Sequence, residues 1–434
     1  MQAPGVDSSS ALIKPVTSAN TSVEMHSSCF TGPQLIGRKM KMKRTLALLL
    51  MLSSTSVIAG QVYVSPSSGD DAGPGNREKP FKTLQAAMDK MRAGDTCFIM
   101  PGLYEYNRVE FKPAGVDFDH PTVFRFLEDG EGRAVFAAPE GKQPSIGFSN
   151  FTRIEGLWAG GEPRGRDETS RISIKGGAVA FGREGVQIVG CTFFGEGFQL
   201  LAGNTARNCL IRDCRFVHMG AGWFAHAIYL SGGPEPTSQD IRVIGNTFIE
   251  GMGFALHGWH TPQRLTIVGN FTAGHSCAMV TQGPGHIIHH NFFWKPHGKT
   301  TNGPRPDWKW CALLPNDVLR FDHNMCWSTY PIREDGKSEA EPQANYTMPN
   351  HGGTQMNLIE VKPAQIPKKV TWLPRTEQQI DTAVETISNY FQTHTPEQMS
   401  AKAVPDLEAA FATVKVQYTP TESDLASRPN ESAK

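Results

Sequence analysis

Short apolar segments with the alternation of β-strands recur along residues 186–326. Each segment leads to a cysteine or asparagine, the marker, and in four copies a phenylalanine stands two residues after it. The markers are Cys191, Cys214, Asn246, Asn270, Asn291 and Asn324. Three intervals between successive markers are 23, 24 and 21 residues, and the other two contain insertions.

This interval predicts a solenoid. A period in the low twenties, with strand alternation and no helical pattern, is typical of a parallel β-helix in which each unit forms one coil. Strands of successive coils would pair about 4.8 Å apart. Equivalent side chains would then stack, so we expect a ladder of asparagine amides and a column of phenylalanines. Leucine-rich repeats share the period, but the chain lacks their leucine consensus and helical halves.

Residues 67–106 are predicted to begin the solenoid. Apolar residues share one helical face, Thr83 is a suitable N-cap, and Gly94 stands just past the expected end. The apolar residues are Leu84, Ala87, Met88 and Met91. A helix here would cover the open edge of the first coil.

The same segment carries a family resemblance. The run G-D-D-x-G-x-G, then P-F-K-T-L-Q-A-A, A-G-D-T and P-G-x-Y, resembles the first segment of right-handed parallel β-helix proteins of the pectate-lyase-like superfamily. With the repeats, the resemblance covers residues 61–330. It implies an all-β, right-handed parallel β-helix with an N-terminal capping helix and a short helical C-terminal extension. Because this fold hosts lyases, hydrolases, epimerases and binding proteins, the resemblance does not select an activity.

The rest of the chain divides by composition. Residues 331–375 are predicted to be irregular, 376–415 to form a helical extension that caps the far end of the solenoid, and 416–434 to be a disordered tail. Thr376 and Gln379 form a capping box for the first of these helices.

Residues 39–59 read as a signal peptide, with a basic start, an apolar run and a small-residue cleavage site. We therefore expect a secreted or periplasmic protein, translation from Met40 or Met42, and a spurious or disordered extension at residues 1–38. An internal membrane anchor is the alternative, although the apolar run is short for a span. No membrane span is expected after removal of the signal.

The charge balance and the cysteines exclude some classes of partner and structural site. The 42 basic and 42 acidic residues balance, which argues against nucleic acid as the partner. Seven cysteines follow residue 60, an odd number without a CxxC pair, so we expect neither a disulfide framework nor a zinc site. Most should be small buried hydrophobes.

A later strand in each coil carries the candidate chemistry. Strand alternation is predicted to turn Phe198, Leu200, Ile228, Leu230, Phe254, Leu256, Ala278 and Val280 inward. It is predicted to turn Gln199, Leu201, Tyr229, Ser231, Ala255, His257, Trp259, Met279 and Thr281 outward. Stacking would then place Tyr229 and His257 on neighbouring coils of one outer face. The marker pattern does not require these histidines, yet 11 of the 14 histidines lie between His218 and His351.

A tyrosine–histidine pair beside a tryptophan suits a uronate-containing polysaccharide. The indole would stack on a sugar ring, one member of the pair would take the proton next to the carboxylate, and the other would protonate the leaving oxygen. We predict Tyr229 and His257 as catalytic residues. The predicted substrate-binding residues are His226, Trp259, His260, Arg264 and Lys309. The resemblance also implies a cation that neutralises the carboxylate: arginine, lysine or calcium, with Lys295 also near in sequence.

The leading hypothesis is thus a lyase or C5-epimerase acting on an acidic polysaccharide. The rival is a non-catalytic surface or matrix protein that binds glycans. Glycoside hydrolysis is disfavoured, because the repeat region lacks the paired aspartates that the resemblance would imply for hydrolases.

Other polar groups have weaker functional interpretations. A metal site formed by His226, His257 and His260 is one alternative, since imidazole is a common ligand, but their spacing matches no known metal motif. An ion site at Asp70 and Asp71 is another, although such a run is more typical of a turn. Glu235 and Asp240 are alternative acid partners of Tyr229. His289, His290 and His323 are predicted to be structural.

Overall fold

The structure is a computed structural model. It describes residues 59–130, 132–139, 145–160, 178–195, 199–203, 205–220, 226–230, 238–258, 261–300, 303–304, 310–315, 318–327, 330–335, 346–347, 359–360, 376–401 and 404–426. The predicted N-terminal extension (1–38) and all but the last residue of the predicted signal peptide (39–59) lie outside these ranges. None of the helices in the described ranges has the length and apolarity needed to cross a membrane.

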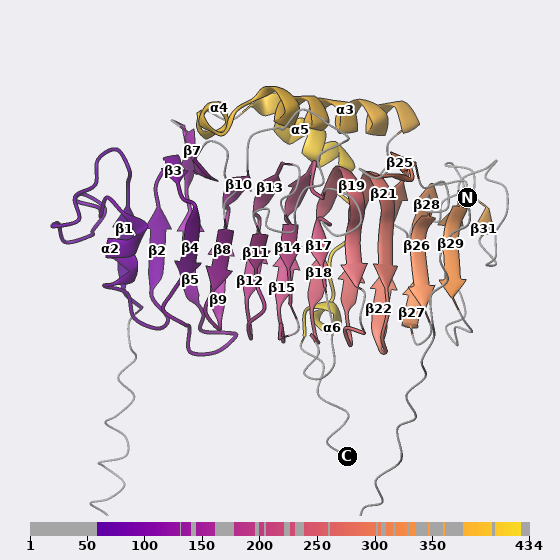
Figure 1. Ribbon diagram of the computed structural model, residues 1–434, viewed down its shortest axis with the longest axis horizontal. Helices are drawn as coiled ribbons and strands as arrows, with labels where there is room; N and C mark the ends of the chain where they lie inside the picture. Colours follow the sequence, from indigo (N-terminus) through magenta and orange to yellow (C-terminus); the bar gives the residue numbers. More distant parts are fainter. Residues whose placement is uncertain are drawn as a thin grey trace, which may run out of the picture. The chain divides into compact units, whose positions relative to one another are not determined.

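The described chain winds into a right-handed parallel β-helix, as predicted (Figure 1). Strands from successive coils pair in parallel and form three stacks. The first stack contains β1 (Gln61–Val64), β2 (Thr96–Ile99), β5 (Thr122–Phe126), β9 (Thr152–Glu155), β12 (Gln187–Val189), β15 (Leu210–Arg212), β18 (Arg242–Ile244), β20 (Thr266–Val268), β22 (His286–His289) and β27 (Val318–Asp322).

The second and third stacks are joined by the two long strands β19 (Thr247–Gly258) and β21 (Phe271–Thr281), which belong to both. The second stack also contains β3 (Gly102–Glu105), β7 (Gly132–Ala137), β10 (Trp158–Gly160), β13 (Thr192–Phe194), β16 (Arg215–Val217), β23 (Phe292–Trp294), β28 (Met325–Trp327), β30 (Tyr346–Thr347) and β31 (Ile359–Glu360). The third also contains β4 (Arg108–Phe111), β8 (Ser145–Phe148), β11 (Ala178–Ala180), β14 (Gln199–Leu201), β17 (Ile228–Tyr229), β26 (Trp310–Pro315) and β29 (Tyr330–Asp335). Short antiparallel pairs involve β6 (Glu128–Asp129) with β7, and β24 (Lys299–Thr300) with β25 (Gly303–Pro304).

The markers form the predicted ladder inside the coils. Asn246 Nδ2 donates to Asn270 Oδ1 at 3.0 Å, and Asn270 Nδ2 donates to Asn291 Oδ1 at 2.9 Å. The Asn291 amide continues the ladder to Asn324 at 2.9 Å. Each Oδ1 also accepts the backbone N–H of the preceding marker, so one side chain satisfies two buried donors.

The interior of the coils is apolar, with the predicted phenylalanine column. Phe193 stacks on Phe216 with ring centroids 5.5 Å apart, and Phe216 stacks on Phe248 at 4.6 Å. The six cysteines whose side chains are described are buried, as predicted: Cys97, Cys191, Cys209, Cys214, Cys277 and Cys326.

The predicted faces were wrong at four positions: Phe254 and Ala255 in β19, and Met279 and Val280 in β21. In β19, Ala255 lies in the core and Phe254 contacts His226 and His257, because the strand register shifts between Gly251 and Phe254. In β21, Met279 pairs with Leu256 in the core, whereas Val280 pairs with His257. A slip of one residue exchanges the faces of a strand, and the apolar run 277–280 in β21 does not reveal it in the sequence.

The first coil begins with β1 and the short helix α2 (Leu84–Met88). Its N-cap is Thr83, whose hydroxyl accepts the Ala86 N–H at 3.2 Å. The helix ends at Met88, well before the predicted end near Gly94. Leu84, Ala87 and Met88 are buried in the same core as the first strands.

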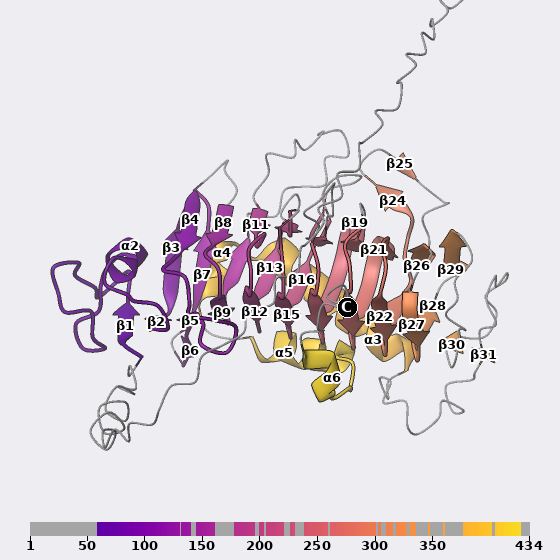
Figure 2. The ribbon, with the colours of Figure 1, turned by 90° about the horizontal axis from the view of Figure 1, so that it is seen from below.

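In the described C-terminal residues, 376–401 and 404–426, the helices are α3 (Glu377–Thr393), α4 (Pro396–Ser400), α5 (Pro405–Val414) and α6 (Glu422–Leu425). The predicted capping box of Thr376 and Gln379 is present at α3. The prediction that these helices cap the far end was wrong, because they run along the coils (Figures 1 and 2).

An outward apolar surface on the second stack explains this position. It includes Val135, Trp158, Phe194, Val217, Ile249 and Ala273. The apolar faces of α3 and α5 pack on this surface, and Phe391 stacks on Trp158 with ring centroids 5.7 Å apart. Lys295 pairs with Glu377 and Asp381 of α3, each at 2.8 Å. These ion pairs of Lys295 therefore hold α3 against the second stack.

The segment after α5 lies against the first stack, in part of the chain predicted to be a disordered tail. Asp424 Oδ1 is 3.0 Å from His289 Nε2, and the Tyr418 ring stacks on His290 with centroids 4.3 Å apart. His290 also stacks on His323 at 4.9 Å. His289 and His290 thus hold this segment, and His323 packs behind His290, as expected for structural histidines. The polar composition of the segment had suggested disorder instead.

A buried histidine makes the fold sensitive to acid. His275 is 0% exposed, and burial, followed by the nearby His297, lowers the pKa of its imidazole from 6.5 to about 3. The unfolded chain takes up this proton below about pH 6.5 and the folded chain does not. Stability is therefore expected to fall by about 1.4 kcal/mol per pH unit from this group as pH decreases from about 6.5 towards 3.

His275→Gln should make the free energy of unfolding less dependent on pH over this range, as measured by denaturant titrations at several pH values. Equal slopes for wild type and His275→Gln would contradict the assignment.

Candidate functional site

Tyr229 and His257 lie side by side on the outer face of the third stack, as predicted. They are register partners on β17 and β19. Their rings stack with centroids 4.9 Å apart and an interplanar angle of 22°. Their neighbours in the strands, Ile228 and Leu256, point into the core. Strand alternation therefore turns the phenol and the imidazole outward together.

His226 completes an aromatic cluster with this pair. Its ring centroid lies 4.1 Å from that of His257 and 5.6 Å from that of Tyr229. His226 is buried, and its Nδ1 accepts the backbone N–H of Phe254 at 3.2 Å. With Nδ1 as acceptor, the neutral ring carries its proton on Nε2. The buried ring packs against both members of the pair and fixes their orientation.

Burial raises the pKa of Tyr229 above its ordinary value of 10. The phenol consequently keeps its proton at neutral pH and acts as a hydrogen-bond and proton donor. Proton abstraction by a phenolate would require deprotonation of a partly buried group. The environment therefore suits Tyr229 to the role of acid.

The pair belongs to one outward row that crosses seven coils. Register pairing gives the order Glu110, Gly147, Ala180, Leu201, Tyr229, His257 and Val280. Gly147 and Ala180 have little or no side chain, so the surface is depressed between Glu110 and Leu201. A hollow of about 230 Å³ lies at this depression.

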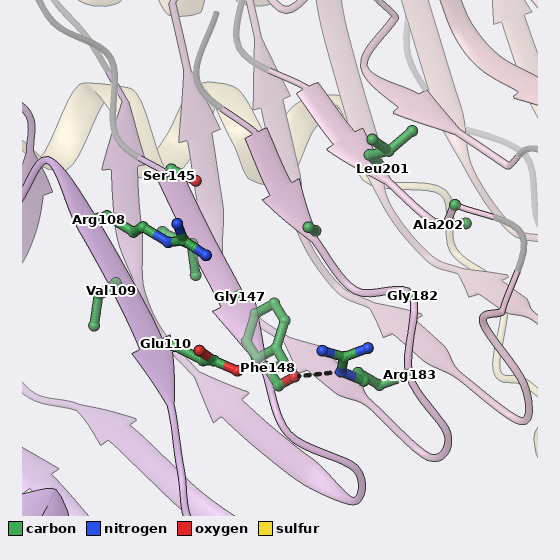
Figure 3. A pocket seen from close by; sticks show the side chains of 13 residues that line it. Arg108, Val109, Glu110, Ser145, Gly147, Phe148, Gly182, Arg183, Leu201 and Ala202 are labelled. Carbon is green, nitrogen blue, oxygen red and sulfur yellow. Dashed lines mark hydrogen bonds between the residues drawn. The ribbon is translucent and has the colours of Figure 1, made fainter. Parts of the chain in front are cut away.

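Charged side chains border the hollow, which we call the arginine hollow (Figure 3). Arg108 and Glu110 come from β4, and Arg183 follows β11 on the opposite side. Arg183 Nε donates to the carbonyl oxygen of Phe148 at 3.1 Å, which holds the guanidinium in place. Leu201 lines the hollow and pairs in register with Tyr229, so the hollow and the pair are adjacent along the row.

Sequence reasoning missed Arg108, Glu110 and Arg183. The marker alignment began at residue 186, whereas the coils that carry these residues come before it. For Arg108 and Glu110 the sequence did contain a weak indication of an outward position: Arg108-Val109-Glu110-Phe111 alternates strictly between polar and apolar residues, as in a strand.

Of the other predicted substrate-binding residues, the structure describes Arg264. Trp259, His260 and Lys309 lie outside the described residues, as does Glu235. Arg264 binds Asp240 through two hydrogen bonds of 2.8 and 2.6 Å at the turn preceding β20. Asp240 is thereby committed to an ion pair, which disfavours its predicted alternative role as an acid. Substrate binding by Arg264 stays a prediction.

The described residues do not fit the calcium that the resemblance allowed. They contain no group of three or more histidine, cysteine or acidic side chains that could hold a metal ion. The carboxylate of Glu110 shares the hollow with two arginines, which repel a cation. Asp71 instead accepts the backbone N–H groups of Lys82 and Thr83, each at 2.8 Å, and Asp70 accepts the N–H of Ala72. Both aspartates order the loop before α2.

Comparison with known proteins gives matches to parts of the chain. Residues 67–157 match a family described as a protein of unknown function (DUF1565). The protein YwoF of Bacillus subtilis (strain 168), described as uncharacterized, is 41% identical over 68 residues. That match covers 16% of this chain and only 14% of the relative.

Solved structures with a similar arrangement are distant in sequence. Pectate lyase Pel9A is 14% identical, with 81% of this chain and 90% of that chain covered and a TM-score of 0.37. XylC, solved in complex with xylose, is 9% identical, with coverages of 76% and 81% and a TM-score of 0.38. A rhamnogalacturonan lyase is 13% identical, with coverages of 70% and 86% and a TM-score of 0.32. The assignment of the β-helix rests on the strand pairing of this chain itself.

Proposed function

We propose that this protein acts on a uronate-containing polysaccharide, which lies along the outward row of the third stack. The observation that carries the proposal is the stacked Tyr229–His257 pair, 4.9 Å between ring centroids, on the row that leads into the arginine hollow. The reaction begins with removal of the C5 proton of a uronate, and leads to β-elimination or C5 epimerisation. The expected location is secreted or periplasmic.

The arginine hollow suits the carboxylates of such a polymer. Arg108 and Arg183 are both exposed and line the hollow from opposite sides. A guanidinium binds a carboxylate through two parallel hydrogen bonds. Successive coils are about 4.8 Å apart, so Arg183 stands roughly two coils, about 10 Å, from Tyr229. Arg183 therefore binds the carboxylate of a neighbouring sugar unit and sets the register of the chain.

The Tyr229–His257 pair suits the proton transfers. A neutral imidazole accepts the C5 proton, and the burial of Tyr229 keeps its phenol protonated as the donor. His226 packs against both rings and limits their movement. A pair of carboxylates, as glycoside hydrolysis requires, is not found among the residues lining the hollow, where Glu110 is the single acid.

The proposal is tested by incubating the protein with a panel of acidic polysaccharides: alginate, pectate, ulvan and glycosaminoglycans. Unsaturated uronate ends, detected by ultraviolet absorbance, or C5-inverted units, detected by NMR, would support it. Binding without any product would favour the rival, a non-catalytic glycan-binding protein. New reducing ends without the ultraviolet band would indicate hydrolysis instead.

Arg183→Gln is expected to raise KM for an acidic polysaccharide about tenfold, with a small change in kcat. The reason is the loss of one charge-assisted hydrogen bond, about 1.4 kcal/mol. The effect should shrink at high salt, where exposed charges are screened. Arg125→Gln on the first stack is the matched control, since Arg125 is also exposed but pairs with Glu155. Equal KM values for the two variants would contradict the role of the arginine hollow.

A further inference from the structure

The Tyr229–His257 pair also restricts the stereochemistry of the reaction. The two side chains occupy the same outward position on consecutive coils, and their rings lie nearly parallel at 22°. Both polar groups therefore meet a sugar ring from the side that faces the coils. A base and an acid on one side of the ring can act only on two substituents that share that side.

The packing of other rings around His257 supports this one-sided arrangement. Phe254 stacks on the His257 ring with centroids 4.9 Å apart, and His226 packs at 4.1 Å. These contacts hold the imidazole in a column with Tyr229 and oppose its rotation to reach around a bound sugar. C5 epimerisation requires a proton donor on the side of the ring opposite the base, which this pair does not provide.

Resting on the proposed function, we infer that this protein catalyses syn β-elimination and that its substrate units are D-mannuronate or D-glucuronate. In both sugars H5 and the glycosidic O4 lie on the same side of the ring. In D-galacturonate, L-guluronate and L-iduronate they lie on opposite sides, so elimination there needs groups on two sides.

The elimination step balances without an oxidant or a metal. His257 takes the proton from C5, and the C5–H electron pair forms the C4=C5 double bond. The C4–O4 bond breaks, and O4 leaves with the proton of the Tyr229 phenol. One product carries an unsaturated uronate at its new non-reducing end, and the other carries a free hydroxyl at its new reducing end. Proton return from His257 to Tyr229 restores the pair.

Poly-D-mannuronate and poly-L-guluronate provide a matched test, because the two polymers have the same charge per unit and differ only in the configuration at C5. We expect similar binding of both polymers to the arginine hollow. We expect kcat, from the ultraviolet absorbance of the product, to be at least about 100-fold higher on poly-D-mannuronate, the size of a well-placed acid–base contribution. A glucuronan should behave like poly-D-mannuronate, and polygalacturonate like poly-L-guluronate.

The outcomes separate this inference from the proposed function. Faster elimination on poly-L-guluronate or polygalacturonate would overturn the syn assignment and leave a uronate lyase in place. Inversion at C5 with deuterium uptake from D2O, without chain cleavage, would also overturn the syn assignment, and the protein would then be a C5-epimerase within the proposed function. Absence of both products on all four polymers and on the wider panel would overturn the proposed function itself.

Discussion

Tyr229→Phe is expected to lower kcat on an acidic polysaccharide by about 10²–10⁴-fold, with little change in KM. The variant keeps the ring that stacks on His257 and removes only the hydroxyl that donates the proton. His257→Gln should lower kcat by a similar factor, because it removes the base. Initial rates of unsaturated product formation measure both effects. The double variant should lose little more than either single variant, since the two groups act in one step.

Two controls make this result interpretable. Tyr63→Phe removes a hydroxyl from a tyrosine on the first stack that also stacks on an aromatic ring, and it should leave kcat unchanged. Thermal unfolding of each variant checks that the coils remain intact. Full activity in folded Tyr229→Phe would remove the phenol from the mechanism.

Asn270→Ala is expected to lower the free energy of unfolding by about 2–5 kcal/mol, because each buried polar group left without a partner costs about 1–3 kcal/mol. Asn270 Oδ1 accepts both the backbone N–H and the side-chain amide of Asn246. Its own amide donates to Val243 and Asn291. Denaturant titration measures the loss.

Asn150→Ala is the control for the ladder. Asn150 also accepts an N–H from the next coil, from Glu184 at 3.2 Å, but it is exposed. Water replaces that bond, so the expected loss is below about 1 kcal/mol. Equal losses at Asn270 and Asn150 would show that the buried ladder does not hold the coils together.

The marker pattern predicted the coil geometry because a buried hydrogen-bond ladder requires the same kind of side chain at the same position of each coil that it joins. Asn246 and Asn270 occupy equivalent positions and bind one another, so the same residue recurs at the same interval. The pairing of Tyr229 with His257 followed from the same geometry. Strand alternation sufficed there because inward isoleucine and leucine flank polar outward residues.

Features without this repetition were not predictable. Phe254 and Val280 were assigned to the wrong face, since a register shift in β19 and an apolar run within β21 hide the alternation. The arginine hollow arises because Gly147 has no side chain and Ala180 has only a methyl group, and such a depression leaves no pattern of its own in the sequence. The path of α3 depended on Trp158 and Phe194, outward apolar residues that resemble core residues in a sequence.

The most direct test of the central claim, that the outward row of the third stack is the substrate site, is a crystal structure of Tyr229→Phe with a mannuronate or glucuronate oligosaccharide. The account predicts a chain along the row, with one carboxylate bound by Arg183 or Arg108 and the C5 of another unit against His257. An oligosaccharide bound instead on the first stack or at either end of the coils would contradict it.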